Sequence, residues 1–134
     1  MHQILITGHG GFPSGVVSAL RFLLGNEPKL DILEFSEEMS HKQYETELIN
    51  FLKKHHRIII FADLTSSVPH QIIARVILEN QYSPEHFLIS GMSLSAITDL
   101  VMKFQFQEAS LEEAPALIEQ ALSHSKDVMH YLSS

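Results

Sequence analysis

The stretch RIIIFAD (residues 57–63) decides the fold. It is a continuous apolar run without polar alternation, which is typical of a parallel strand covered on both faces. HFLIS (86–90) has the same character, and QILIT (3–7) and LDILEF (30–35) supply two further strands. Because helical patterns separate these runs, the sequence predicts an α/β fold with right-handed βαβ units and a doubly wound, mostly parallel sheet.

Helical patterns follow each strand. Ser40 and Gln43 match a capping box at the start of the second helix, and Pro69 marks the start of the third. A fourth helix is expected over 94–104 and a last one over about 111–132. We therefore expect helices on both faces of the sheet.

The expected sheet has the strand order 2-1-3-4 and forms a single domain over residues 1–134. In this order the winding of the sheet reverses between the first and third strands, where open α/β sheets bind ligands beyond the carboxyl ends of the strands. His9 follows the first strand and Asp63 ends the third. These two side chains are therefore predicted to face each other.

The composition excludes several classes of protein. A net charge of −7 with only nine Lys and Arg argues against a nucleic-acid partner, because phosphate neutralisation needs clustered basic side chains. The absence of cysteine excludes disulfides, thiolate zinc sites and cysteine nucleophiles. No compact metal-ligand spacing and no membrane-spanning run occurs. We expect a cytoplasmic protein without metal or cofactor.

His9 lies in LITGHGGFPSG (5–15), where glycines leave space around the imidazole. A carboxylate on one ring nitrogen fixes the tautomer and makes the other nitrogen a better nucleophile. Backbone N–H groups at the two helix starts nearby could hold a phosphoryl group without lysine or metal. The pattern predicts a phosphohistidine carrier with His9 and Asp63 as catalytic residues. The candidate phosphoryl-binding residues are Gly10, Gly11, Thr65, Ser66 and Ser67.

Other interpretations of this stretch fit less well. His9 could be a turn residue that hydrogen-bonds to backbone. A nucleotide-binding domain would use Gly8-x-Gly10 and the acid Glu34, but Pro13 stands where the third glycine belongs. A serine hydrolase is disfavoured because Ser14 is not in a G-x-S-x-G elbow.

Three segments resemble the IIA component of the mannose family of sugar phosphotransferase systems (PTS), which covers mannose, fructose, sorbose and N-acetylgalactosamine. They are ILITGHGGFPSGVVSALRFLLG (4–25), IIIFADLTSSVPHQIIARVIL (58–78) and FLISGMSLSAITDLVM (87–102). The form TGHGGFPSG looks closest to the N-acetylgalactosamine branch. The resemblance extends over nearly the whole chain.

The resemblance implies a dimeric phosphotransferase component. It would accept a phosphoryl group from phospho-HPr on His9, oriented by Asp63, and donate it to a IIB protein for sugar uptake. The membrane components IIC and IID would be reached only indirectly. In this family the loop after the corresponding aspartate usually has two glycines, then Ser or Thr, then Pro. Here Val68 replaces the hydroxyl before Pro69, so Ser66 or Ser67 would have to substitute for it.

Two points stay open at this stage. A regulatory paralogue that signals by its phosphohistidine would carry the same residues. A bare sheet edge also invites pairing with a second copy. The candidate interface residues are apolar side chains of the last strand and the segments after it: Phe87, Leu88, Met92, Phe104, Phe106 and Met129.

Overall fold

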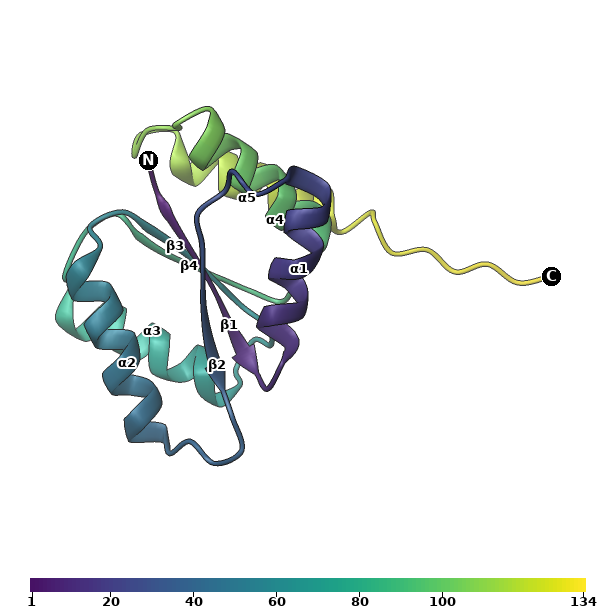
Figure 1. Ribbon diagram of the computed structural model, residues 1–134. Helices are drawn as coiled ribbons and strands as arrows, with labels where there is room; N and C mark the ends of the chain where they lie inside the picture. The colour runs from purple at the N-terminus through teal and green to yellow at the C-terminus, as the bar shows by residue number, and fades with distance from the viewer.

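Four parallel strands form the centre of the molecule. In the computed structural model, which describes residues 1–134, they are β1 (Gln3–His9), β2 (Leu30–Phe35), β3 (Ile58–Ala62) and β4 (His86–Ser90). The order is β2-β1-β3-β4 and every pairing is parallel, which confirms the predicted sheet. The carboxyl ends of β1 and β3 therefore lie side by side at one edge (Figure 1).

Helices cover both faces of the sheet, as predicted. α2 and α3 pack on one face, and α1, α4 and α5 pack on the other (Figure 1). The bounds are α1 (Phe12–Leu24), α2 (His41–Lys54), α3 (Val68–Asn80), α4 (Leu94–Val101), a π-helical segment η1 (Met102–Phe106) and α5 (Ala114–Ser125). No helix combines the length and apolar character needed to cross a membrane.

The burial of β3 explains the pattern that predicted it. Phe61 packs with the core on the side of α1, α4 and α5, whereas Ile60 packs with the core on the side of α2 and α3. Because successive side chains of a strand point to opposite faces, a strand covered twice has no position for a polar residue. All five residues of β3 are buried.

The predicted helix starts are confirmed at α2 and α3. The Ser40 hydroxyl accepts the Gln43 N–H, and the Gln43 side chain accepts the Ser40 N–H. Pro69 lies in the first turn of α3, where its missing N–H leaves no helix hydrogen bond unmade.

The last helix is shorter than predicted. α5 runs over Ala114–Ser125, and the chain beyond it leaves the body as an extended tail, yellow in Figure 1. Met129, Tyr131 and Leu132 are almost fully exposed there. Without a surface to bury its apolar side chains, the end of the periodic pattern is not held in a helix.

The segment after α4 turns inward. The expected helix over 94–104 ends at Val101 and continues as the π-helical η1. Phe104 is fully buried in the core of this chain, so the expectation of an interface role for it is wrong.

Gln105, on η1, joins the amino ends of two strands. Its side-chain oxygen accepts the Lys29 N–H at 2.8 Å, and its amide nitrogen donates to the carbonyls of His2 and Lys29 at 3.0 and 2.8 Å. The amide group is buried and all of these hydrogen bonds are made inside the protein. This amino edge of the sheet is therefore fixed from the C-terminal half of the chain.

His2 is buried at the same edge, and neither of its ring nitrogens has a hydrogen-bond partner. Its ring meets Phe104 edge-on, with 4.9 Å between ring centroids. Burial lowers the pKa of His2 below its ordinary value of 6.5, and the nearby charge of Glu85 opposes this shift only in part. The folded protein therefore holds His2 neutral.

Replacing His2 with Phe should stabilise the protein and weaken the pH dependence of its stability. Removing two buried nitrogens that have no hydrogen-bond partner should raise the free energy of unfolding by about 1 kcal/mol at neutral pH. In the wild type the unfolded His2 binds a proton at a higher pH than the folded one, so the free energy of unfolding falls as the pH falls below about 6.5. Urea unfolding at about pH 7.5 and about pH 5.5 measures this difference.

The His2→Phe variant should keep part of the pH dependence, because burial also lowers the pKa of His86. An equal loss of stability at low pH in variant and wild type would contradict a neutral, buried His2.

Candidate functional site

His9 and Asp63 meet at the carboxyl edge of the sheet, as the strand order predicts. His9 is the last residue of β1, and Asp63 directly follows β3. The Asp63 Oδ2 atom lies 2.9 Å from His9 Nδ1 and also accepts the backbone N–H of His9 at 2.8 Å. The other carboxylate oxygen, Oδ1, accepts the Leu64 N–H at 2.8 Å. Three hydrogen bonds thus fix the carboxylate.

The two partners differ in exposure. The His9 side chain is 46% exposed, whereas the Asp63 side chain is 8% exposed. The imidazole meets the Phe35 ring edge-on, with 6.1 Å between ring centroids. Because Nδ1 faces a carboxylate, the neutral imidazole carries its proton on Nδ1 and keeps the Nε2 lone pair free. The arrangement therefore presents a fixed, accessible nitrogen nucleophile.

Asp63 is held in its charged form. Burial by itself raises the pKa of this carboxyl group, but hydrogen bonds from the His9 backbone N–H, the His9 ring and the Leu64 N–H outweigh it. The net effect keeps the pKa of Asp63 below its ordinary value. The carboxylate is thus anionic at neutral pH and can stabilise positive charge on the imidazole.

Gly8 allows the Asp63 carboxylate to lie close to the end of β1. A Cβ atom at position 8 would lie 2.4 Å from both Cγ and Oδ2 of Asp63, closer than any side chain can tolerate. The sequence interpretation used Gly8 in a nucleotide fingerprint and among the glycines that leave space around His9, but it missed the contact with Asp63. The signal was present, because Gly8 stands beside the histidine at the end of a strand that pairs with β3.

The two glycines after His9 behave differently from each other. Gly10 has a left-handed φ of 54°, and its N–H donates to the Phe35 carbonyl at 3.0 Å. Gly11 is the N-cap of α1, and its N–H donates to no protein acceptor. A Cβ at either position would meet no atom within 4 Å. The surface over His9 is therefore open on this side.

The loop after Asp63 uses most of its polar groups internally. The Thr65 hydroxyl lies 2.6 Å from the Ser90 hydroxyl, and the Ser67 hydroxyl donates to the Leu64 carbonyl at 2.8 Å. The Thr65 N–H and the Ser66 hydroxyl have no protein partner. The structure thus brings the predicted phosphoryl-binding loop to the same edge as His9, but two of its three hydroxyls are already engaged.

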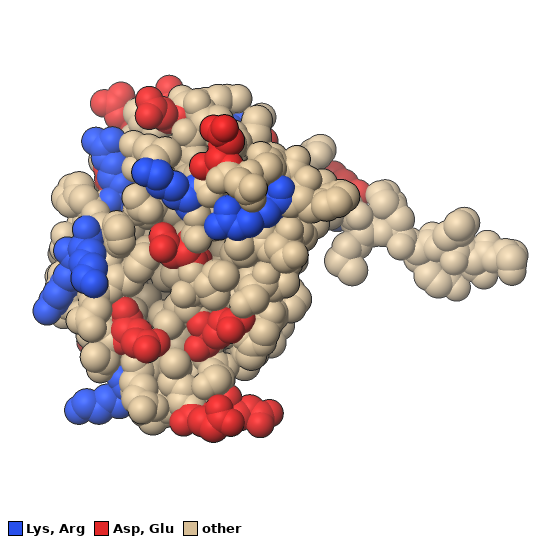
Figure 2. Space-filling model, viewed as in Figure 1, with Lys and Arg blue, Asp and Glu red and all other residues tan.

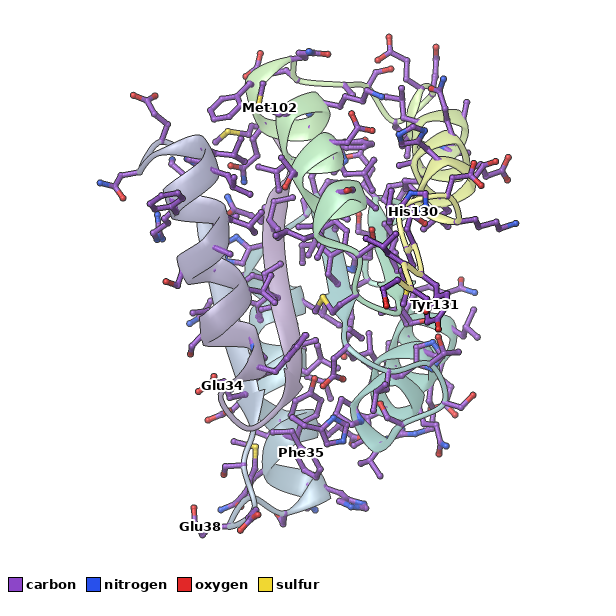
Figure 3. The ribbon with its side chains drawn as sticks, turned by 90° about the vertical axis from the view of Figure 1, so that its right-hand side faces the viewer. Glu34, Phe35, Glu38, Met102, His130 and Tyr131 are labelled. Carbon is purple, nitrogen blue, oxygen red and sulfur yellow. The ribbon has the colours of Figure 1, made fainter.

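Glu34 is engaged at the start of α1. Its Oε2 atom accepts the Ser14 hydroxyl at 2.6 Å and the Ser14 N–H at 3.3 Å. Figure 3 shows Glu34, Phe35 and Glu38 together at one end of the molecule, far from Met102. A carboxylate in this position interacts favourably with the positive end of the helix dipole. Glu34 therefore has a structural role that the nucleotide-binding interpretation did not foresee.

A cleft opens beside the histidine. It has a volume of about 550 Å³ and is lined by His9, Phe12, Asp63, Leu64, Gly91 and Met92. An adjoining apolar groove of about 490 Å³, between α1 and α4, shares Phe12 and Met92 with it. No group of three or more His, Cys, Asp or Glu side chains is placed to hold a metal ion.

Replacing Gly8 with Ala should destabilise the protein and separate Asp63 from His9. The added methyl group overlaps the carboxylate, and overpacking of this kind costs about 1–3 kcal/mol. The matched control is Gly11→Ala, because position 11 has open space and a φ of −83° that any residue adopts. Urea unfolding measures stability, and nitrogen NMR of the His9 ring reports its tautomer. Equal stability of the two variants would contradict the close approach.

A family model covers most of this chain. The family model described as PTS system fructose IIA component matches residues 3–122. No curated protein matches the sequence.

Several solved structures share the fold. The phosphotransferase system component EIIA from Streptococcus agalactiae is 21% identical, with a TM-score of 0.83 over 98% of this chain and 97% of that one. The mannose/sorbose-specific IIA subunit from Enterococcus faecalis is 12% identical, with a TM-score of 0.81 over 99% and 96%. A sigma-54 interaction domain protein from Enterococcus faecalis is 14% identical, with a TM-score of 0.72 over 92% and 91%.

The matched residues 3–122 include all four strands, His9, Asp63 and the loop between Asp63 and α3. The chain thus belongs to the family of PTS system fructose IIA components.

Proposed function

We propose that residues 1–134 act as a phosphoryl-carrier domain of a sugar phosphotransferase system. His9 accepts the phosphoryl group from phospho-HPr and donates it to a IIB component, which serves sugar uptake. The observation that carries this proposal is the half-exposed His9 imidazole whose Nδ1 is paired with the buried Asp63 carboxylate. The resemblance to the N-acetylgalactosamine branch stays a prediction.

The proposed transfer uses His9 Nε2 as nucleophile. Its lone pair attacks the phosphorus atom of the donor, and the bond from phosphorus to the donor breaks as the new phosphorus–nitrogen bond forms. The Nδ1 proton stays in its hydrogen bond to Asp63, so no proton has to move. The ring becomes a phosphoimidazolium whose positive charge is stabilised by the adjacent carboxylate. The same steps in reverse pass the group to the IIB component.

Backbone N–H groups are the proposed ligands of the phosphoryl oxygens. The N–H groups of Gly11 and Thr65 have no protein acceptor, and they lie beside the starts of α1 and α3. Helix starts favour anions, and fixed donors need little reorganisation when the phosphoryl group arrives. The Ser66 hydroxyl is the proposed side-chain donor, which compensates for Val68. Gly10 and Ser67 contribute by shaping the two loops.

The surroundings of His9 suit protein partners. Phe12 and Leu64 are exposed apolar side chains on the cleft beside the imidazole. On its other side, His9 lines a hollow with Phe35, Ser36 and Glu37. Figure 2 shows acidic side chains on the lower part of this face of the molecule, with a basic side chain at its lower left. A donor with an apolar patch and basic side chains around its phosphoryl group would complement this surface.

A regulatory phosphohistidine sensor is the second candidate function. The observation in its favour is the fold that this chain shares with a sigma-54 interaction domain protein. Both candidates require phosphorylation of His9, so onward transfer to a IIB protein separates them. Nucleotide binding is disfavoured, because Glu34 already accepts two hydrogen bonds from Ser14.

We also propose that the protein forms a homodimer and that it lies in the cytoplasm, together with its phosphoryl donor. β4 is an edge strand of the sheet, and unpaired edges favour pairing with another chain. The apolar tail residues Met129, Tyr131 and Leu132 are almost fully exposed in the single chain. A second copy would give both features a partner. Phe106 and Met129 are the exposed members of the predicted interface set.

Replacing His9 with Ala should abolish phosphorylation by phosphoenolpyruvate, enzyme I and HPr. The variant should stay folded, because the ring is half-exposed and little packing is lost. The control is His124→Ala, which removes an exposed histidine on α5. Transfer of labelled phosphate measures the effect. Undiminished labelling of the His9→Ala variant would contradict the proposal, and a labelled wild type that never passes phosphate to IIB proteins would favour the sensor.

Replacing Asp63 with Asn should slow phosphorylation by at least about tenfold, which corresponds to about 1.4 kcal/mol in the transition state. The amide has no negative charge to stabilise the phosphorylated ring, and it does not select the tautomer with a free Nε2. Single-turnover labelling at saturating phospho-HPr measures the rate. A wild-type rate in this variant would show that the His9–Asp63 pair does not serve the transfer.

Light scattering should show a dimer at tens of micromolar. Removing residues 126–134 takes away the exposed tail and should shift the population toward the monomer, while α5 ends before the cut. A monomeric full-length chain at this concentration would contradict the proposed dimer.

A further inference from the structure

We infer that His70 is a positioning residue for the phosphoryl-binding loop, an inference that rests on the proposed function. His70 lies in the first turn of α3 and accepts the backbone N–H of Ser66 on its Nδ1 atom, at 3.0 Å. It keeps the loop between Asp63 and α3 in one conformation, and this conformation leaves the Thr65 N–H available to a phosphoryl oxygen.

Ser66 needs such support because its backbone is strained. Its φ is 67°, in the left-handed region that side chains with a Cβ disfavour. Strain of this kind persists only where the surroundings fix it, and it is common at functional sites. Ser66 is exposed, so packing does not hold it in place.

Hydrogen bonds from α3 hold both sides of Ser66. His70 accepts its N–H, and the Gln71 side-chain amide donates to its carbonyl oxygen at 2.7 Å. Ser67, the N-cap residue of α3, makes no side-chain cap and instead donates its hydroxyl to the Leu64 carbonyl. The usual direction of capping is therefore reversed, because side chains of the first helical turn fix the loop that precedes them.

The loop is fixed at its two ends by the site and by His70. At one end, Asp63 Oδ1 accepts the Leu64 N–H while Oδ2 binds His9. At the other end, His70 and Gln71 hold Ser66. Thr65 lies between these attachments, and its hydroxyl meets Ser90 on the next strand. If the His70 contact is lost, Ser66 can relax out of the left-handed region, and the Thr65 N–H beside it in the loop is then no longer held in one position.

The contact also assigns the protons of two histidines. An imidazole nitrogen that accepts a backbone N–H carries no proton, so neutral His70 has its proton on Nε2. His9 has the opposite tautomer, with its proton on Nδ1 toward Asp63. The two rings can therefore be told apart by nitrogen NMR in the unphosphorylated protein.

A double-mutant cycle tests the role of His70 through the backbone of Ser66. His70→Phe keeps a ring but removes the acceptor, and we expect phosphoryl transfer to His9 to slow by roughly three- to tenfold at saturating phospho-HPr. In a Ser66→Gly background the same His70→Phe change should have almost no effect, because glycine adopts a positive φ without strain. His70→Asn should restore most of the rate, because its side-chain oxygen can accept the same N–H.

The matched control is His124→Phe on α5, which should transfer at the wild-type rate. Equal rates for His70→Phe and the wild type would overturn the inference. An equal slowing by His70→Phe in the wild-type and Ser66→Gly backgrounds would also overturn it, since His70 would then act by another route. A protonated Nδ1 in the NMR spectrum of neutral His70 would do the same without any transfer assay.

The carrier function and the role of His70 can be contradicted separately. If the wild type is not labelled on His9 at all, the proposed function is wrong and the role of His70 falls with it. If the wild type is labelled and the His9→Ala variant is not, the carrier function stands. The double-mutant cycle and the NMR tautomer of His70 then test only the proposed positioning role of His70.

Discussion

The rest of the site depends on the contact between the Asp63 carboxylate and His9. The carboxylate joins the ends of the two central strands, because it accepts the backbone N–H of His9 and also faces the His9 ring. The contact exists only because β1 and β3 are neighbours in the sheet and because Gly8 leaves space for the carboxylate. One side chain therefore connects the strand order to the tautomer of the His9 ring.

The proposed phosphoryl site uses backbone N–H groups in place of the cations that often bind phosphate. Neither lysine nor arginine lines the cleft at His9. The available donors are N–H groups at the starts of two helices, and such groups stabilise anions without carrying a net charge. A neutral site of this kind would bind a phosphoryl group without holding it too firmly, which suits the proposed carrier, since it has to release the group again.

The sequence predicted the features that depend on pattern and missed those that depend on side-chain geometry. The unbroken apolar run of β3 predicted a strand covered on both faces, and the strand order then placed His9 opposite Asp63. The tight contact between Gly8 and Asp63 depends on angstrom-level distances that no periodicity records. Phe104 shows the same limit, because its apolar character fits an interface and a core equally well, and η1 turns it inward.

The fold and the site are secured at opposite ends of the sheet. Gln105 joins the amino ends of β1 and β2 through three hydrogen bonds, whereas His9 and its loops occupy the carboxyl ends. Substitutions at open positions beside His9, such as Gly11, should therefore cost the architecture little, whereas Gly8 is constrained by its contact with Asp63. A scaffold divided in this manner can vary the open surface beside His9 and still fold in the same way.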